Sequence, residues 1–304
     1  MPSALFENFL LHGSKQVLPA FLYGTAWKKE KTADLVYQAL CSGFRGVDTA
    51  AQPKHYREDL VGEGIRRALR EGKVSREDLF VQTKFTSVQG QDSNSMPYNP
   101  NLSLTEQVHT SIKSSLRNLS PSSEDSSAEA TILDSVVLHS PLPTIAETLE
   151  VWRALETYVP HKIRHLGISN VYLGTLEQIY EEAKVKPAVV QNRFYPNTHF
   201  DARVRAFCVE KSIIYQAFWT LSANPEIVHG AEVGLAAHQM GLSKHEAMYC
   251  LILALENVVI LNGTQKETHM AGDLEALQKA KEWALKYPDS WESCMNGFKA
   301  LIAQ

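Results

Sequence analysis

Several short apolar segments of this chain end in side chains that can transfer protons. Segment 44–47 is followed by Asp48, and the loop after it carries the phenol of Tyr56. Further along the chain, Lys84 and His139 stand at the ends of two more such segments. A carboxylate, a phenol, an ammonium and an imidazole are groups that general acid–base catalysis uses. Their positions predict an acid–base site.

The four groups can act together. A free phenol has a pKa of about 10 and is a poor proton donor at neutral pH. An ammonium such as that of Lys84, placed beside the phenol of Tyr56, would stabilise the phenolate and lower this pKa. Asp48 would hold the ammonium in place, and His139 would donate to a substrate oxygen. Each residue alone also fits a structural ion pair, a cap or core packing, so the prediction depends on the four together.

Residues so far apart in the chain meet only where a regular fold gathers the ends of the strands. Short, continuously apolar segments alternate with amphipathic helical patterns, as expected for parallel strands that are covered on both faces. The predicted strands are 21–25, 44–48, 80–84, 135–139, 165–169, 188–191, 213–218 and 258–261. Eight such units predict an α/β fold of the (β/α)8 TIM-barrel type, with its active site at the carboxyl ends of the strands. A doubly wound open sheet is the alternative, although no Gly-x-Gly-x-x-Gly motif follows any strand.

The predicted barrel has additions at both ends. Segment 10–19 has apolar residues on both sides of a Gly-Ser turn, which predicts an N-terminal β-hairpin that could close one end of the barrel. After the last strand, a helix is predicted at 274–285 and an extra C-terminal helix at 291–302. We expect residues 1–304 to form a single barrel domain.

Two polar segments interrupt the alternation of strands and helices. Segment 87–102 is rich in Asn, Ser and Pro and directly follows the strand that ends at Lys84, where a barrel enzyme would place a substrate loop. Segment 120–130 lacks apolar side chains apart from alanine and a proline, and predicts an insertion on the opposite rim. No function can be assigned to this insertion from its sequence.

Composition excludes several classes of function. The formal charge of −4 argues against a nucleic-acid partner or an anionic membrane surface. No segment is long and apolar enough to span a bilayer and the first residues lack a leader pattern, so we expect a cytoplasmic protein. No Cys-x-x-Cys pair occurs and no His-x-His pair lies at a strand end, so no metal site is predicted. A metal-dependent barrel hydrolase is therefore disfavoured.

The order of short motifs along the chain resembles that of the aldo-keto reductase family. The matching segments cover almost the whole chain and are Gly-Thr-Ala-Trp at 24–27, Gly-Phe-Arg-Gly-Val-Asp-Thr-Ala at 43–50, Val-Gln-Thr-Lys at 81–84, Leu-His-Ser-Pro at 138–141, Gly-Ile-Ser-Asn at 167–170 and Val-Gln-Asn at 190–192. The resemblance implies a (β/α)8 barrel that binds NADPH and reduces an aldehyde or ketone to an alcohol.

The resemblance also implies roles for the four proton-transfer residues. Tyr56 matches the general acid that protonates the carbonyl oxygen, and Lys84 matches the residue that lowers its pKa. Asp48 would hold Lys84, and His139 would orient and polarise the carbonyl.

The cofactor contacts are likewise implied by the resemblance. Ser169, Asn170 and Gln191 match the residues that hold the nicotinamide carboxamide, and Phe218 matches the ring that stacks on the nicotinamide. The full set of implied cofactor contacts is Gly24, Thr25, Asp48, Ser169, Asn170, Gln191, Phe218, Thr220, Leu221, Gly263, Thr264, Lys266, His269 and Asp273.

The substrate site is expected to be lined by aromatic side chains. The expected walls are Trp27, Phe85 and Trp219, with the loop 87–102 and the aromatics Phe194 and Tyr195. The chain ends soon after its last predicted helix, so the C-terminal loop that closes the pocket in many members is short or absent and the pocket should be open.

The chain departs from the family pattern in the loop that carries the phenol. In the family the tyrosine follows the aspartate by five residues, whereas here Pro53 stands at that place and Tyr56 is eight residues on. We interpret this as a small insertion, and His55 is the competing group beside Lys84.

The cofactor phosphate site also departs from the family pattern. The Lys and Arg that often grip the ribose 2′-phosphate are replaced by Gly263 and His269, although Thr264 and Lys266 could bind a phosphate. We therefore expect NADPH, with NADH as the alternative cofactor.

A rival of a different class is a non-catalytic barrel that binds the nucleotide and acts as a regulatory or redox-sensing subunit. Such a subunit would not need Tyr56 and Lys84 together, so the four-residue set favours the enzyme.

Overall fold

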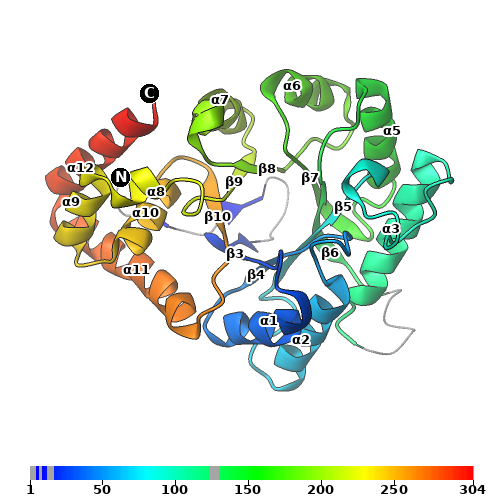
Figure 1. The fold of residues 1–304 in the computed structure, drawn as a ribbon, viewed down its shortest axis with the longest axis horizontal. Coiled ribbons are helices and arrows are strands. Elements are labelled where there is room, and N and C mark those ends of the chain that lie inside the picture. The colour runs from blue at the N-terminus through cyan, green and yellow to red at the C-terminus, as the bar shows by residue number, and fades with distance from the viewer. Residues whose placement is uncertain (1–4, 7–8, 12–16, 123–129, 304) are drawn as a thin grey trace.

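Eight parallel strands close into a barrel, and helices surround it (Figure 1). The computed structural model describes residues 5–6, 9–11, 17–122 and 130–303. The order of strands around the barrel is β10-β3-β4-β5-β6-β7-β8-β9, so each strand pairs with its neighbour in the chain and β10 closes the ring against β3. The predicted (β/α)8 fold is confirmed.

The barrel strands agree with the predicted segments to within about two residues at either end. They are β3 Phe21–Gly24, β4 Gly46–Asp48, β5 Phe80–Phe85, β6 Leu133–Leu138, β7 Ile163–Ser169, β8 Val189–Arg193, β9 Ile214–Phe218 and β10 Val258–Asn262.

The helices cover the outside of the barrel. They are α1 Thr32–Cys41, α2 Glu58–Arg70, α3 Leu104–Asn118, α5 Ile145–Glu156, α6 Leu173–Glu182, α7 Ala202–Glu210, α8 Pro225–His229, α9 Ala231–Met240, α10 Lys244–Leu253, α11 Glu267–Lys286 and α12 Pro288–Ile302, with short 3-10 segments η2 Lys29–Lys31, η3 Val88–Gly90 and η4 Pro196–Asp201. α11 begins earlier than predicted because its first residues are mostly polar and give no apolar period. The extra C-terminal helix is present as α12.

Three helices begin at a capping box, in which a Ser or Thr hydroxyl and a Glu three residues later satisfy each other's backbone N–H groups. These pairs are Ser103 with Glu106 in α3, Thr144 with Glu147 in α5 and Ser243 with Glu246 in α10. The sequence therefore fixes these helix starts locally.

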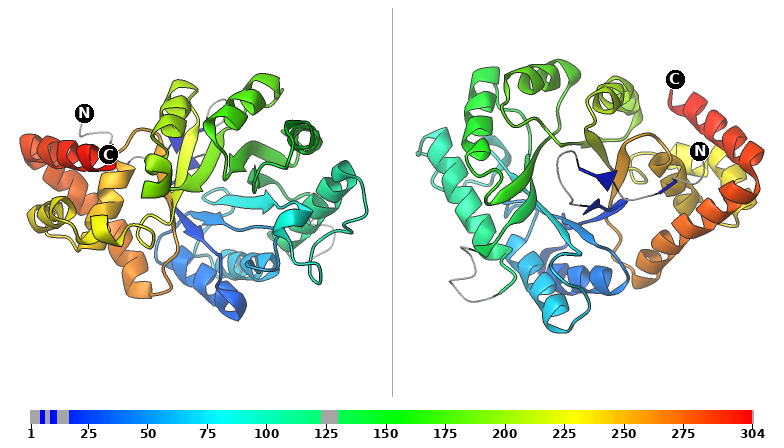
Figure 2. Two further views of the ribbon diagram at one scale, coloured as in Figure 1. Left: turned by 45° about the horizontal axis from the view of Figure 1, so that its top comes forward. Right: turned by 180° about the vertical axis from the view of Figure 1, so that it is seen from behind.

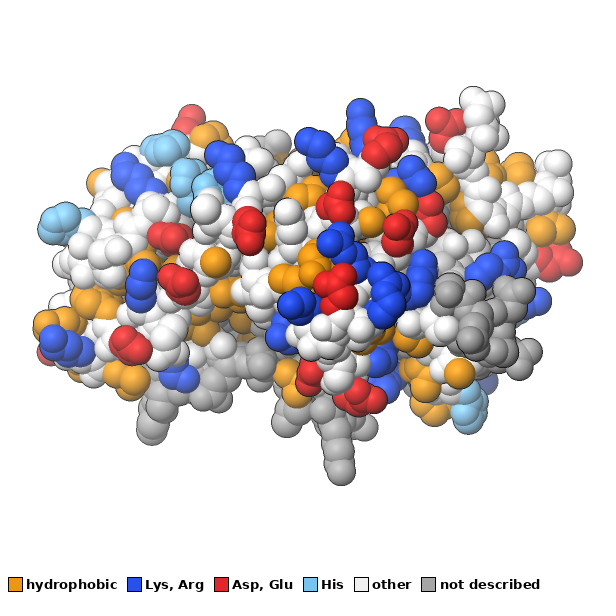
Figure 3. Space-filling view, turned by 90° about the horizontal axis from the view of Figure 1, so that it is seen from below, with side chains coloured by type: hydrophobic (Ala, Val, Ile, Leu, Met, Phe, Trp, Pro, Cys, Tyr) orange, Lys and Arg blue, Asp and Glu red, His pale blue; other side chains and the backbone are white. Residues whose placement is uncertain are grey.

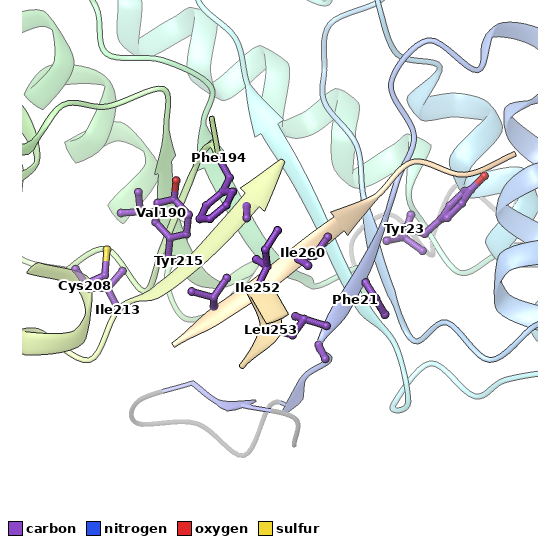
Figure 4. Close-up of a cluster of buried hydrophobic side chains, with 14 of the residues drawn as sticks. Phe21, Tyr23, Val190, Phe194, Cys208, Ile213, Tyr215, Ile252, Leu253 and Ile260 are labelled. Atoms are coloured by element: carbon purple, nitrogen blue, oxygen red, sulfur yellow. The ribbon is translucent and has the colours of Figure 1, made fainter. Parts of the chain in front are cut away.

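Apolar side chains fill the space between the barrel and its helices. Figure 4 shows part of this cluster, with Phe21 of β3 and Ile260 of β10 near Ile252 and Leu253 of α10, and Tyr23 further along β3. Because side chains alternate along a strand, the residues between them point into the barrel.

The inside of the barrel is layered. Its lower layer is apolar and contains Leu11, Leu18, Leu22, Phe80, Val137, Val189, Ile214 and Val259. Two residues further along, β5, β8 and β9 each place a glutamine on the same side: Gln82, Gln191 and Gln216. Two residues further again stand Lys84, Arg193 and Phe218, at the carboxyl ends of these strands. The alternation thus builds a polar layer under the mouth of the barrel.

The N-terminal hairpin is present. β1 (Phe9–Leu10) pairs antiparallel with β2 (Val17–Leu18), and Leu11 and Leu18 belong to the apolar cluster inside the barrel. Figure 2 shows the two strands lying across the barrel opening when the molecule is seen from behind. The predicted Gly-Ser turn lies outside the described residues, as does most of the insertion 120–130.

The surface carries charges of both signs. Figure 3 shows the side of the molecule that lies at the bottom of Figure 1, where basic and acidic side chains are intermingled. In the part of the chain that the structure describes, no helix has the length and hydropathy needed to cross a membrane.

Candidate active site

Three adjacent strands bring the predicted ion pair and imidazole together. Asp48 ends β4, Lys84 lies near the end of β5, and His139 directly follows β6. The Lys84 ammonium donates to Asp48 Oδ2 at 2.5 Å and to the carbonyl oxygen of Thr49 at 2.9 Å. Both side chains of the pair are almost completely buried. Burial lowers the pKa of Lys84, and the Asp48 carboxylate opposes this effect. The hydrogen bonds to Asp48 and Thr49 hold the ammonium in place.

The enlarged loop folds Tyr56 back to the barrel mouth. The carbonyl oxygen of Gln52 accepts hydrogen bonds from the backbone N–H groups of His55 and Tyr56, both at 3.0 Å, so residues 52–56 form one helical turn. The Lys84 ammonium lies 5.2 Å from the centre of the Tyr56 ring. The Tyr56 and His139 rings meet edge to face with centroids 6.0 Å apart. The insertion is therefore taken up within the loop.

His55 occupies a different place. Its ring lies against the indole of Trp27, with centroids 3.9 Å apart, and its Nδ1 pairs with the side-chain oxygen of Gln52 at 3.0 Å. The structure places Tyr56, and not His55, over the ammonium of Lys84.

The pKa of Tyr56 departs from the expectation. Burial raises it well above the ordinary value, and the negative charge of Asp48 adds to the rise. The expected lowering by Lys84 is not found, because burial is the larger cause of the rise and the Asp48 carboxylate acts in the same direction. Tyr56 is therefore fully protonated at neutral pH.

His139 is a neutral imidazole. Burial lowers its pKa to about 3, and the positive charges of Lys84, His55 and Arg193 contribute to the shift. Its Nδ1 pairs with the hydroxyl of Thr86 at 2.7 Å. A hydroxyl that donates to Nδ1 leaves the proton on Nε2, and His139 can then donate a hydrogen bond into the site.

A network of amides holds the second oxygen of the Asp48 carboxylate. Asp48 Oδ1 accepts from Gln82 at 2.7 Å and from Gln191 at 3.0 Å. Both donors also bind the side-chain oxygen of Gln216, at 2.7 Å and 2.9 Å, and Gln216 donates back to Gln82 at 3.0 Å. Gln82 and Gln216 were not identified from the sequence. Strand alternation was the available signal, because Gln82 precedes Lys84 by two residues and so shares its face.

The residues expected at the nicotinamide lie at the end of β7 and within β8. Ser169 donates to the carbonyl oxygen of Gln191 at 2.6 Å. The Asn170 amide donates to the carbonyl oxygen of His139 at 2.9 Å and accepts from Arg193 at 3.0 Å. The structure thus brings Ser169, Asn170 and Gln191 together beside His139.

The end of β3 lies beside Asp48. Gly24 ends β3 and pairs in register with Asp48. The hydroxyl and the backbone N–H of Thr25 both donate to the carbonyl oxygen of Asp48, at 2.9 Å and 3.0 Å. Thr25 thereby ties the first strand to the carboxylate-bearing strand.

The loop after β9 supplies the expected aromatic ring and its neighbours. Phe218 ends β9 and its ring meets Trp219 edge to face at 5.9 Å. Thr220 is buried and its carbonyl oxygen accepts from the amide of Asn224 at 3.0 Å, while Leu221 is half-buried.

A buried lysine that was not identified from the sequence lies where the chain leaves β10. The Lys28 ammonium donates to the carbonyl oxygen of Gly263 at 2.9 Å and lies 4.9 Å from the centre of the Tyr23 ring. Burial lowers the pKa of Lys28 to about 8. The Tyr23 hydroxyl donates to the carbonyl oxygen of Thr264 at 3.0 Å. The sequence signal for Lys28 was its position directly after the Gly-Thr-Ala-Trp motif at 24–27.

The other residues expected at the phosphate end surround the start of α11. Lys266 and His269 are exposed there, and the hydroxyl of Thr264 accepts from the Lys266 backbone N–H at 3.3 Å. Asp273 is buried and accepts from the amide of Asn262 at 2.7 Å. Burial raises the pKa of Asp273 to about 6.

Two of the expected substrate-wall residues are exposed at the rim. Trp27 is 62% exposed and Trp219 is 52% exposed. Phe85 is different: it is completely buried and stacks on Tyr98, because strand alternation turns it away from the barrel axis that Lys84 faces. Phe194 is also a core residue, packed against Phe200. We therefore remove Phe85 and Phe194 from the candidate wall.

The loop 87–102 is anchored beside the site. Gln91 donates to the carbonyl oxygen of Ala51 at 2.8 Å, and Tyr98 donates to that of Thr86 at 2.6 Å. Gln52 donates in turn to the carbonyl oxygen of Gly90 at 2.5 Å. Hydrogen bonds thus join the loop 87–102 to the loop that carries Tyr56 along one edge of the barrel mouth.

Comparisons with known proteins agree with this architecture. Residues 20–287 match the aldo/keto reductase family. An uncharacterised oxidoreductase of Bacillus subtilis is 30% identical over 232 residues, which are 75% of this chain and 73% of the relative. A glyoxal reductase of the same organism is 31% identical over 222 residues, 72% of this chain and 68% of the relative.

A solved structure shares the fold. The aldo-keto reductase of the silkworm Bombyx mori in complex with NADP superposes with a TM-score of 0.72 at 19% identity, over 92% of this chain and 93% of that one. The chain belongs to the aldo/keto reductase family, and the relatives that it matches include an NAD(P)H-dependent D-xylose reductase and a glyoxal reductase.

Proposed function

We propose that this protein is an NADPH-dependent carbonyl reductase in which Tyr56 donates the proton to the substrate oxygen. The observation that carries the proposal is the cluster of Tyr56, Lys84 and His139 at one barrel mouth, with Asp48 holding the ammonium. A carbonyl oxygen that gains a hydride at its carbon must also gain a proton, and a positioned phenol can supply it.

Tyr56 acts as the general acid. Its raised pKa keeps the phenol protonated before reaction. As the proton leaves, the Lys84 ammonium, 5.2 Å from the centre of the ring, would offset part of the cost of burying the phenolate charge. Asp48 and the Thr49 carbonyl fix the ammonium on its other side, so little reorganisation is needed.

His139 orients the carbonyl. It is uncharged at neutral pH because burial lowers its pKa to about 3. With Nδ1 paired to Thr86, Nε2 can donate to the same substrate oxygen that receives the Tyr56 proton. The polarised carbonyl carbon then accepts the hydride more readily.

The residues at the mouth fit a nicotinamide dinucleotide. Ser169, Asn170 and Gln191 are the proposed contacts of the carboxamide, which would exchange for some of the hydrogen bonds that they make within the protein. Phe218, at the end of β9, is the proposed stacking ring. Bound NADPH supplies the hydride. The remaining proposed contacts come from Gly24, Thr25, Asp48, Thr220, Leu221, Gly263, Thr264, Lys266, His269 and Asp273.

The phosphate end supports a phosphorylated cofactor. Lys28 offers a cation beside Gly263, and a Cβ added at Gly263 would meet no atom within 4 Å, so open space adjoins this glycine. α11 begins without a side-chain cap, which leaves backbone N–H groups available for an anion. Lys266 at this helix start is our proposed contact for the 2′-phosphate, and it favours NADPH over NADH.

We further propose that residues 1–304 act as a single barrel domain in the cytoplasm, on a small-molecule carbonyl substrate. All four cysteines are free thiols, which fits a reducing compartment. Trp27, Trp219 and the loop 87–102 would line an open substrate site.

The test is a screen of aldehydes, ketones and sugars by oxidation of NADPH and, separately, NADH. We expect turnover with at least one carbonyl and a higher kcat/KM for NADPH. A clear preference for NADH would overturn the cofactor assignment, and no turnover with any carbonyl would overturn the proposed activity.

A further inference from the structure

Arg193 stands at the mouth of the barrel, where aromatic rings and one amide surround it. Strand alternation places it above Gln191 on the inner side of β8. Its register partner on β9 is Phe218, and its guanidinium lies 5.5 Å from the centre of the Phe218 ring and 4.7 Å from that of Trp219. Among the described residues, no Asp or Glu lies within ion-pair distance of it.

Only one of its donor groups has a hydrogen-bond acceptor within the described chain. Arg193 Nη1 donates to the side-chain oxygen of Asn170 at 3.0 Å. A guanidinium has five N–H donors in a planar fork. Aromatic rings and the single amide hold Arg193 in place and leave much of this fork unused.

Arg193 is close to the reacting groups. The Asn170 amide that accepts from Arg193 also donates to the carbonyl oxygen of His139 at 2.9 Å. The positive charge of Arg193 contributes to the lowered pKa of His139, which is consistent with this proximity. A substrate whose carbonyl lies at His139 could therefore reach the guanidinium with another of its groups.

The proposed 2′-phosphate site does not account for this cation. That site lies at Lys28, Gly263 and Lys266, where β10 meets β3 and α11 begins. Arg193 lies on β8, with β9 between it and β10, beside the residues proposed for the uncharged carboxamide. An anion at Arg193 would thus belong to the substrate.

We propose that Arg193 binds an anionic group, a carboxylate or a phosphate, carried by the carbonyl substrate. The substrate class is then an aldehyde or ketone with an acidic group a few atoms from its carbonyl. The fork geometry suits a bidentate contact with either anion, and the exposed indoles of Trp27 and Trp219 would flank the part between. This inference rests on the proposed function and names its substrate class.

The experiment compares anionic carbonyl compounds with neutral counterparts on the same skeleton. The probes are 4-oxobutanoate with its methyl ester, 4-carboxybenzaldehyde with methyl 4-formylbenzoate, and glyceraldehyde 3-phosphate with glyceraldehyde. For the wild-type protein, we expect kcat/KM to be higher for the anionic member of at least one pair. The pair that shows it distinguishes carboxylate from phosphate.

The variants are Arg193→Met, Arg193→Lys and the control Arg153→Met, an exposed arginine on α5. In Arg193→Met the ratio of kcat/KM for acid over ester should fall roughly 10–100-fold, the value of a charge-assisted hydrogen bond. Arg193→Lys should retain part of the ratio, and Arg153→Met should retain all of it. An equal loss for acid and ester in Arg193→Met would show that Arg193 only positions Asn170 and would overturn the proposal.

A binding measurement separates this inference from the proposed function. Titration with 4-hydroxybutanoate or 4-(hydroxymethyl)benzoate should change the tryptophan fluorescence of the wild-type protein, and Arg193→Met should weaken binding at least about tenfold. Turnover of neutral carbonyls without preference for any anionic probe would overturn the inference and leave the proposed function standing. No turnover of any carbonyl would overturn the proposed function itself.

Discussion

The ammonium of Lys84 lies 5.2 Å from the centre of the Tyr56 ring, although the two residues come from different elements. Lys84 belongs to a barrel strand, and Tyr56 ends a one-turn insertion that the Gln52 carbonyl closes. The contact places a protonated phenol next to a fixed positive charge. This relationship underlies the proposed proton transfer.

Replacement of Tyr56 by phenylalanine should remove the proton donor and keep the ring. We expect Tyr56→Phe to lower kcat at least about 100-fold. Binding of NADPH, measured by fluorescence titration, should stay close to that of the wild type. Tyr180→Phe, on α6 outside the mouth, is the matched control and should keep full activity. Undiminished turnover in Tyr56→Phe would rule out Tyr56 as the general acid.

Replacement of Lys266 by methionine tests the proposed contact with the 2′-phosphate. The lost charge-assisted hydrogen bond should raise KM for NADPH roughly tenfold and leave KM for NADH nearly unchanged. Lys279→Met, an exposed lysine further along α11, should change neither value. Steady-state kinetics with both cofactors checks this, and an equal rise for NADPH and NADH would place the phosphate elsewhere.

The pair Gln82 and Gln216 should contribute to stability. Gln216→Leu leaves the side-chain oxygen of Gln82 buried without its donor, which costs about 1–3 kcal/mol. Urea unfolding should show this loss in the free energy of unfolding. Gln278→Leu, at an exposed position on α11, should stay within about 0.5 kcal/mol of the wild type. Equal stability of the two variants would show that the amide network contributes nothing.

His165 should make stability depend on pH. Burial lowers its pKa to about 4, from an ordinary value of 6.5, and the charge of Arg164 adds to the shift. The unfolded chain therefore binds this proton at a higher pH than the folded protein does. The stabilising contribution is complete above pH 6.5 and is lost as the pH falls from 6.5 towards 4.

The corresponding variant is His165→Leu. Its melting temperature should fall less than that of the wild type between pH 7 and about 4.5, because about one proton fewer is taken up on unfolding. His161→Gln, at an exposed position, is the control and should follow the wild type. Parallel melting curves of wild type and His165→Leu across this range would contradict the prediction. His139 has a shift of the same sign and remains in both proteins.

The fold was accessible from the sequence because its signals are local. Each strand is a short apolar run, each helix has its own apolar period, and three helix starts carry a capping box within four residues. The order of the motifs then indicated which strand ends carry Asp48, Lys84 and His139. These features depend on neighbours in the chain, so they can be recognised without the tertiary structure.

The site required the tertiary structure because its contacts are distant in the chain. Gln82 and Gln216 meet across 134 residues, and only the closed barrel sets their register. Whether Tyr56 or His55 faces Lys84 depends on how the inserted turn packs. The raised pKa of Tyr56 reflects its burial beside Asp48, which no local pattern encodes. The sequence by itself determined the barrel and its strand-end residues, and the packing of loops and the burial of charges decided how those residues face one another.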